Sequence, residues 1–162
     1  CSHWGITGGD FVRTINASVR QRVPLSFIQT RFSFISHSQD LLGQKILQKA
    51  QALFPDQIET AQDIKAPAGF IHAYDLARIF IAAVEQVGLT GDIVADRRTV
   101  RAALENLDKP VQGLVKRYKK PFGVFGPERP DAHEALSQED LVMARYGDND
   151  EIILLTDMVI ER

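Results

Sequence analysis

Cysteine is nearly absent from this chain of 162 residues, which contains only Cys1. One thiol excludes an intrachain disulfide framework and a Cys-x-x-Cys metal site, and it leaves the redox compartment open. An excess of basic residues is also missing, because the formal net charge is −2. Bulk electrostatic attraction to nucleic acid needs a basic face, so the composition argues against that partner. No apolar run approaches the roughly 20 residues that span a bilayer.

Several catalytic and metal-binding signatures are missing as well. The sequence has no Gly-x-Ser-x-Gly elbow and no phosphate-loop lysine. His133 and Glu134 begin like a zinc-protease helix, but Ser137 stands where the second histidine belongs. Asp148 and Asp150 form an acidic turn that lacks the other ligands of a calcium loop. We therefore expect no enzyme activity, no catalytic residue, no cofactor and no metal.

The residues that are present describe an ordinary globular chain. Apolar residues make up 44% and charged residues 25% of it, and its length suits one domain or parts of two lobes. Four basic residues form a local cluster: Lys116, Arg117, Lys119 and Lys120. This cluster is interpreted as a solvated face, with an anionic partner as the alternative.

Hydrophobic periodicity and turn residues predict an alternation of helices and strands. The helices are predicted over 10–23, 38–53 (capped by Ser38), 68–87 and 97–107. The strands are predicted over 25–30, 141–146 and 152–155, the last two joined by a turn at 147–150. Residues 55–66 and 108–138 are expected to be irregular. Apolar residues surround most of the helix over 68–87, so we expect most of its surface to be buried.

The first nine residues are typical of a buried strand that ends in a tight turn before a helix. A strand needs neighbours for its N–H and C=O groups, so we expect the chain to be the back part of a longer α/β protein. In such sheets ligands bind at the carboxyl ends of strands. Cys1-Ser2 also fits the lipidated start of a bacterial lipoprotein, but Trp4-Gly5 follows where a polar tether is usual.

Three sequence blocks together resemble the periplasmic type I solute-binding proteins of ABC transporters, in the branched-chain amino acid group. The blocks are Ser2–Phe11 with Val23-Pro24-Leu25, Pro67–Ala77 with Ala83–Gly88, and Val100–Leu107 with Asp131–Glu134 and the closing hairpin. The resemblance implies an α/β fold of two Rossmann-like lobes, of which this chain is the C-terminal half with a C-terminal β-hairpin. It implies that residues 1–60 and 138–162 belong to lobe 2, and residues 61–137 to lobe 1.

The same resemblance implies an extracytoplasmic solute-binding component of an ABC importer, in the periplasm or outside the cell. A signal peptide is then expected in the missing N-terminal part. The ligand would be a small polar solute (an amino acid, amide or carboxylate), and the protein partner would be a membrane permease. A fragment that lacks half of its fold is expected to expose apolar surface and to form a homodimer or a swapped dimer.

The resemblance also assigns ligand-binding positions, in three groups. These are Trp4 and Gly5 in the first turn, Gln29, Thr30 and Arg31 after the next strand, and Phe70, His72 and Tyr74 on the long helix. Arg31 stands where amino-acid binders carry an acidic residue, so it favours a carboxylate or another anion.

Simpler interpretations of the same residues stay open. Phe70 and Tyr74 are four residues apart and suit core packing, His72 suits a hydrogen-bonded, partly buried role, and Arg31 suits a surface ion pair. A nucleotide-dependent oxidoreductase of short-chain dehydrogenase type is the alternative function, because Gly5–Gly9 is similar to that family's phosphate loop. The third glycine of that loop is missing. The family's Tyr-x-x-x-Lys pair is missing too, because Arg78 stands four residues after Tyr74, where the lysine belongs.

Overall fold

A computed structural model describes the chain over 6–7, 11–15, 17–23, 25–64, 66–148 and 150–155. The chain divides into two compact units. The first unit comprises Cys1–Ile71 and Leu141–Arg162, and the second comprises His72–Asp140. The observed boundaries thus follow residues 71 and 140, whereas the predicted ones follow residues 60 and 137. The assignment of these parts to lobes stays a prediction.

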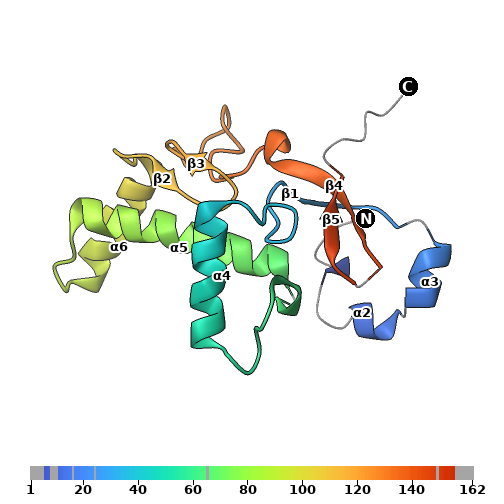
Figure 1. Cartoon of the computed structure of the whole chain (residues 1–162). Helices are drawn as coiled ribbons and strands as arrows, with labels where there is room; N and C mark the ends of the chain where they lie inside the picture. The colour runs from blue at the N-terminus through green and yellow to red at the C-terminus, as the bar shows by residue number, and fades with distance from the viewer. Residues whose placement is uncertain are drawn as a thin grey trace. The chain divides into compact units, whose positions relative to one another are not determined.

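A three-stranded antiparallel sheet forms the centre of the first unit. It consists of β1 (Phe27–Thr30), β4 (Leu141–Tyr146) and β5 (Ile152–Leu154), in the order β1-β4-β5. Phe27 pairs with Ala144, and Ala144 pairs in turn with Leu154. Figure 1 shows β4 and β5 as a hairpin. The three predicted strands and the predicted hairpin are therefore confirmed.

The core of the first unit lies on one side of this sheet. Its buried members are Ile6, Phe27, Ala144, Ile152 and Leu154. The Tyr146 ring joins them, with its centroid 5.4 Å from that of Phe27 and 5.8 Å from that of Phe11. Alternate strand residues point to the same face of a sheet, which brings 144 and 146 together here.

The predicted helix over 10–23 is wrong as a single element. The structure has two short helices, α2 (Phe11–Thr14) and α3 (Ala17–Arg22). The N–H of Ile15 still donates to the Phe11 carbonyl, at 2.8 Å. The described backbone leaves the helix at Ile15, and the β-branched side chains of Thr14 and Ile15 lower the helix propensity there.

Helix α4 (Leu41–Leu53) begins later than predicted. Its N-cap is Asp40, whose Oδ1 accepts a 2.6 Å hydrogen bond from the Gly43 N–H. The predicted Ser38 cap is wrong, because Ser38 lies in the preceding turn and its carbonyl accepts from Gln44 Nε2 instead. The polar connector that follows contains one 3-10 turn, η1 (Ala61–Asp63).

Helix α5 (Pro67–Val87) confirms the prediction of a long helix, and Gly88 follows it with a φ of 70°. The left-handed backbone at Gly88 suits a glycine that ends a helix. The prediction that most of α5 is buried is wrong, because Leu76 and Phe80 are about half exposed. In the described part of the chain, α5 is the one helix whose length and composition suffice for a membrane span. The expectation that no segment approaches the length of a membrane span is therefore corrected. Buried helices of globular proteins meet the same criterion of length and composition.

The second unit is built around the buried side of α5, which carries Ile79 and Ala83. Helix α6 (Ile93–Glu105) starts four residues before its predicted beginning, because Asp92 Oδ1 caps it through the Val94 and Ala95 N–H groups. A two-stranded antiparallel ribbon, β2 (Val111–Gln112) and β3 (Arg117–Tyr118), follows α6. The core that α5, α6 and this ribbon share consists of Ile79, Ala83, Val100, Ala103, Leu107, Val111 and Tyr118.

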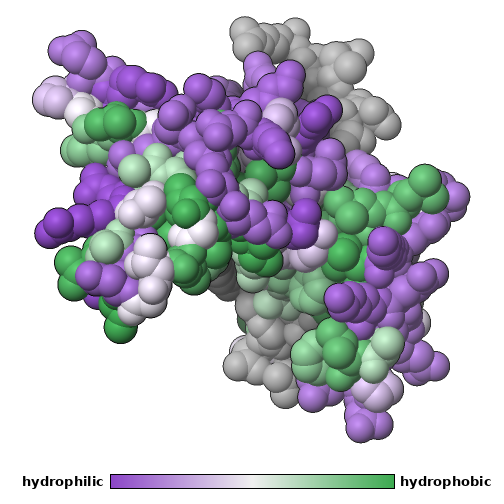
Figure 2. All heavy atoms as spheres, turned by 90° about the vertical axis from the view of Figure 1, so that its left-hand side faces the viewer, coloured by the Kyte–Doolittle hydropathy of each residue, from purple (hydrophilic) through white to green (hydrophobic). Residues whose placement is uncertain are grey.

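The segment predicted as irregular, 108–138, is mostly so. Apart from β2 and β3 it contains turns and an isolated bridge between Gly126 and Arg129, and the 3-10 turn η2 (Gln138–Asp140) closes it. The fold class is thus mixed α/β with a small antiparallel sheet. Figure 2 shows one face of the molecule as largely hydrophilic, interrupted by hydrophobic areas.

Candidate functional site

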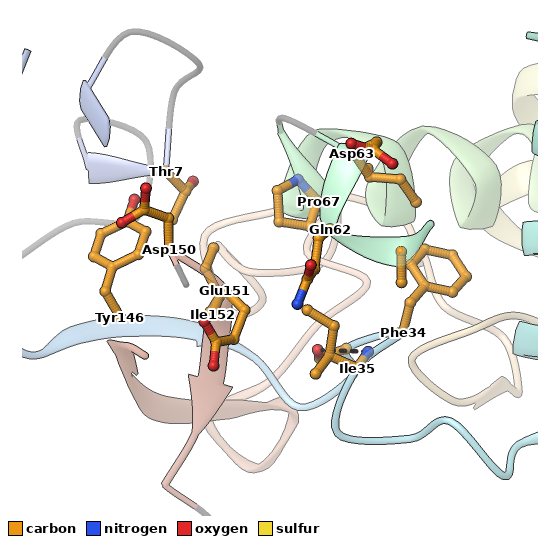
Figure 3. Close-up of a pocket in the computed structure, with 13 residues that line it drawn as sticks. Thr7, Phe34, Ile35, Gln62, Asp63, Pro67, Tyr146, Asp150, Glu151 and Ile152 are labelled. Carbon is orange, nitrogen blue, oxygen red and sulfur yellow. Dashed lines mark hydrogen bonds between the residues drawn. The ribbon is translucent and has the colours of Figure 1, made fainter. Parts of the chain in front are cut away.

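A cavity of about 610 Å³ lies within the first unit. Its wall is formed by four segments that are distant in sequence. The lining residues are Thr7, Ser33–Ile35, Ala61–Ile64 with Pro67, and Tyr146 with Asp150–Ile152. Figure 3 shows the hairpin residues on one side of the space and those of η1 and the loop after β1 on the other. The cavity thus lies where several loops of this unit converge.

Local hydrogen bonds fix the loop after β1. Ser33 Oγ accepts from the N–H groups of Ile35 at 3.2 Å and of Ser36 at 3.3 Å. This is the side-chain turn typical of serine, which bends the chain back toward itself. As a result Ser33 is buried while Ile35 stays partly accessible in the cavity wall.

Aromatic packing supports the same wall from behind. The Phe34 ring meets the Phe32 ring edge-on at 5.2 Å and the Phe70 ring edge-on at 5.6 Å. Edge-to-face pairs at this separation are favourable beyond the area that they bury. The pair Phe34–Phe70 therefore anchors the loop to the first turn of α5.

The η1 side of the cavity is held by Asp63. Its Oδ2 accepts from the Thr60 N–H at 2.7 Å and from the Thr60 hydroxyl at 3.0 Å. The Glu59 N–H donates to the same oxygen at 3.2 Å. These bonds fix the short turn and place Gln62 and Asp63 at the cavity.

The hairpin side is organised around the Tyr146 ring. The Tyr146 hydroxyl donates to the Ile6 carbonyl, and the Arg20 guanidinium lies over the ring with its Cζ 5.4 Å from the centroid. Arg20 also forms an ion pair with Asp150 at the other end of the turn. Burial raises the pKa of Tyr146 to about 12, against the opposing effect of the Arg20 charge. The phenol is therefore neutral over the ordinary pH range, and because its proton is donated to Ile6, only its oxygen can accept a further hydrogen bond.

The ionisable side chains that line the cavity are all acidic, apart from the Tyr146 phenol. They are Asp63, Asp150 and Glu151, and no Lys, Arg or His lines it in the part of the chain that the structure describes. Arg20 balances Asp150 from outside the wall. Phe34, Ile64 and Pro67 supply apolar surface beside them. Such a wall suits a neutral or positively charged group with an apolar body better than an anion.

The sequence-predicted positions after β1 lie next to this wall without lining it. Gln29 and Thr30 are buried at the end of the strand, and Gln29 Oε1 accepts from the Thr30 N–H at 3.2 Å. Arg31 is exposed. The cavity wall begins two residues later, at Ser33. Trp4 and Gly5 lie outside the described residues.

The three predicted positions on α5 divide between the two units. Phe70 belongs to the first unit and backs the cavity wall through Phe34. His72 and Tyr74 belong to the second unit and are half-buried there. Burial lowers the pKa of His72 and so favours a neutral imidazole, while the nearby charge of Asp75 acts in the opposite direction.

Sequence reasoning missed most of the residues that line the cavity. By residue type, 147–150 indicate only a turn and 55–66 only a connector, yet Asp150 and Gln62 both belong to the wall. The available signal was the position of Ser33–Ile35 directly after a predicted ligand loop. Within the described ranges no group of three metal-ligating side chains is found.

A second hollow, of about 570 Å³, lies in the second unit between α5 and the chain after α6. Arg78, Glu85 and Gln86 line its helix side. Gln86 joins the two sides, since its Nε2 donates to the Asn106 carbonyl and its Oε1 accepts from the Asp108 N–H. Its wall mixes both charges and shows no convergent polar set, so the first cavity is the stronger candidate site.

Comparison with known proteins adds no assignment to this geometry. No protein-family model matches the chain, and no significant match is found among curated proteins or among solved structures.

Proposed function

We propose that the chain is part of the extracytoplasmic solute-binding component of an ABC importer. The finer fold in this proposal is the type I periplasmic-binding-protein fold with Rossmann-like lobes. A small polar ligand would be trapped between two lobes, and closure would be stabilised by contacts that exist only in the closed form. The closed form would then dock on a membrane permease in the periplasm or at the cell surface.

One observation carries this proposal. Both predicted ligand loops continue directly into the wall of the same cavity: Thr7 lies two residues after Gly5, and Ser33 lies two residues after Arg31. In the parallel sheets of Rossmann-like lobes ligands bind at the carboxyl ends of strands. The sheet described here is antiparallel, so the support comes from the shared wall and not from the strand ends. The coincidence favours a binding site at this position.

The wall also narrows the expected solute. Acidic side chains and the neutral Tyr146 phenol favour an amide or an ammonium-bearing solute with an apolar part over a simple carboxylate. Arg31 favours an anion by its residue type, but it is exposed and is not a lining residue. Of the three expected classes, we therefore place amides and amino acids, which carry an ammonium group, before carboxylates.

Thermal-shift and calorimetric titration test the proposal with a defined panel. Amides, amines, amino acids and carboxylates form one arm, and NAD and NADP form the other. We expect stabilisation by a member of the first arm and none by the nucleotides, because binding to the native state alone raises its stability. Stabilisation by NADP alone would reject the transporter proposal in favour of the oxidoreductase.

A matched pair of variants ties binding to the cavity. Ile35→Trp puts a large side chain into the wall, so it should abolish the thermal shift. Ile28→Trp changes an exposed residue of β1 outside the wall and should leave the shift unchanged. Equal binding by both variants would place the solute elsewhere.

A further inference from the structure

The 3-10 turn η1 contributes two polar side chains to the wall of the first cavity, those of Gln62 and Asp63. Asp63 serves the turn itself, because its Oδ2 accepts from the Thr60 N–H and hydroxyl and from the Glu59 N–H. Gln62 is exposed, and its carboxamide forms no hydrogen bond with any residue that the structure describes. The Gln62 carboxamide is therefore the polar group of η1 that a solute can engage.

The Gln62 side chain extends into the cavity. Figure 3 shows its carboxamide directed from η1 into the space beside Ile35, with the hairpin residues on the other side of that space. The backbone on both sides of Gln62 is held in place, because the Ile64 N–H donates to the Ala61 carbonyl at 3.4 Å and Ile64 itself is buried. The turn thus presents this carboxamide to the cavity from a fixed position.

The hairpin side of the cavity is rich in hydrogen-bond acceptors. Asp150 and Glu151 contribute carboxylates, and the Tyr146 oxygen can accept one further bond. Arg20 forms an ion pair with Asp150, so the charges of Arg20, Asp150 and Glu151 sum to one negative charge. An ammonium group matches this side, because it carries a positive charge and only donates hydrogen bonds.

The η1 side suits a different group. A carboxamide has N–H donors and a carbonyl acceptor in one plane, so a solute carboxamide and that of Gln62 can exchange two hydrogen bonds. A carboxylate only accepts and leaves the Gln62 oxygen unmatched, whereas an ammonium group only donates and leaves the Gln62 amide nitrogen unmatched. A binding site discriminates against analogues that leave its polar groups without a partner.

We propose that Gln62 is the specificity-determining residue of the first cavity, and that it selects solutes with an ammonium group at one end and a carboxamide at the other. The ammonium group lies at the hairpin side and the carboxamide pairs with Gln62. Ile35 and Ile152 supply apolar wall for the carbon chain between the two ends. This inference rests on the proposed solute-binding function and narrows its solute to an amino-amide.

Isothermal titration calorimetry with three matched solutes tests the proposal. The probes are γ-aminobutyramide, γ-aminobutyrate and putrescine, which share one carbon skeleton and differ in ending in a carboxamide, a carboxylate or a second ammonium group. Their homologues with one carbon less and one carbon more extend the series. We expect the chain to bind an amide at least about threefold more tightly than its two counterparts, because only the amide matches both halves of the Gln62 carboxamide.

Substitutions at Gln62 should change this preference in a defined direction. Gln62→Glu only accepts and adds a negative charge, so the affinity for putrescine relative to the amide should rise roughly tenfold. Gln62→Lys only donates and adds a positive charge, so the affinity for γ-aminobutyrate relative to the amide should rise by a similar factor. Both variants should keep the wild-type melting temperature, because Gln62 is exposed.

Gln57→Glu and Gln57→Lys are the matched controls. Gln57 is exposed in the same connector and does not line the cavity, so these variants should keep the preference of the wild type. An unchanged preference in both Gln62 variants would overturn the proposal. Tighter binding of γ-aminobutyrate or putrescine than of the amide by the wild type would overturn it as well.

The wider panel of amides, amines, amino acids and carboxylates separates the role of Gln62 from solute binding itself. If none of the matched probes binds, but a member of that panel binds and Ile35→Trp abolishes its binding, the solute-binding function stands and the role of Gln62 is refuted. If neither set of compounds binds, both proposals are refuted.

Discussion

The Tyr118 hydroxyl donates a 2.8 Å hydrogen bond to the Asp75 carboxylate across 43 positions of sequence. The same carboxylate accepts from the Leu114 N–H at 2.5 Å and from the Val115 N–H at 3.0 Å. Both side chains are almost fully buried, Asp75 at 2% and Tyr118 at 3% exposure. One carboxylate of α5 therefore holds both the turn between β2 and β3 and the Tyr118 side chain of β3.

Asp75→Ala should destabilise the second unit by about 3 kcal/mol or more, because three donors would lose their charged acceptor in a buried site. Tyr118→Phe removes only one of these donors and should cost about 1–2 kcal/mol. Urea unfolding measures both differences. Asp108→Asn changes an exposed carboxylate of the same unit and is the control. Equal stabilities of Asp75→Ala and the control would contradict this role.

Gly113→Ala should also be destabilising, by about 1–3 kcal/mol, because it overpacks a filled site. A Cβ at Gly113 would lie 2.6 Å from Asp75 Oδ2 and 2.6 Å from Tyr118 Cε2. Gly126→Ala is a matched control, since a Cβ at Gly126 would have nothing within 4 Å. Thermal melts of the two variants should differ clearly, and identical melting temperatures would show that the ribbon can shift freely.

Acid should weaken the second unit through Asp140. Burial alone would raise the pKa of this carboxyl, but the Lys116 ammonium and the Ser137 N–H and hydroxyl hold the pKa below its ordinary value. A lowered native pKa stabilises the fold above the ordinary value, and that stabilisation is lost as the pH falls through the native one. The advantage of the wild type over Asp140→Asn should therefore be full at neutral pH and should shrink below roughly pH 4. A difference that stays constant from neutral to acid pH would refute this assignment.

Alkali should act on the first unit through Tyr146. Its pKa is raised to about 12 by burial, so its stabilising effect is complete below the ordinary tyrosine value and is lost as the pH rises toward 12. The near-ultraviolet absorbance of tyrosinate should show this late titration, and Tyr146→Phe should remove it. The same variant loses the hydrogen bond to the Ile6 carbonyl and should melt at a lower temperature at neutral pH. Unchanged late titration in Tyr146→Phe would assign it to another residue.

The sequence predicted the elements whose signals are local. The strands of the hairpin and the turn between them follow from alternation and turn residues, and the length of α5 follows from its apolar spacing before Gly88. The exposure of Phe80 could not be predicted, because apolar spacing reports that a face is apolar and not whether another element covers it. The break after Thr14 was missed because the apolar stripe outweighs the weak helix propensities there.

The candidate site was less predictable than the fold. Its wall joins Thr7, Ser33 and Tyr146, which no local pattern connects. The acceptor role of Asp75 was hidden for the same reason, since two of its donors are backbone N–H groups 39 and 40 residues away. Backbone donors have no residue-type signature, so only the folded geometry reveals them.

The closeness of Asp75, Gly113 and Tyr118 has a consequence for natural variation. A side chain at 113 needs the room that Asp75 and Tyr118 now occupy, and a different residue at 75 leaves the ribbon without its acceptor. Across relatives of this chain, we expect substitutions at these three positions to be correlated, while the neighbouring exposed positions change independently of them.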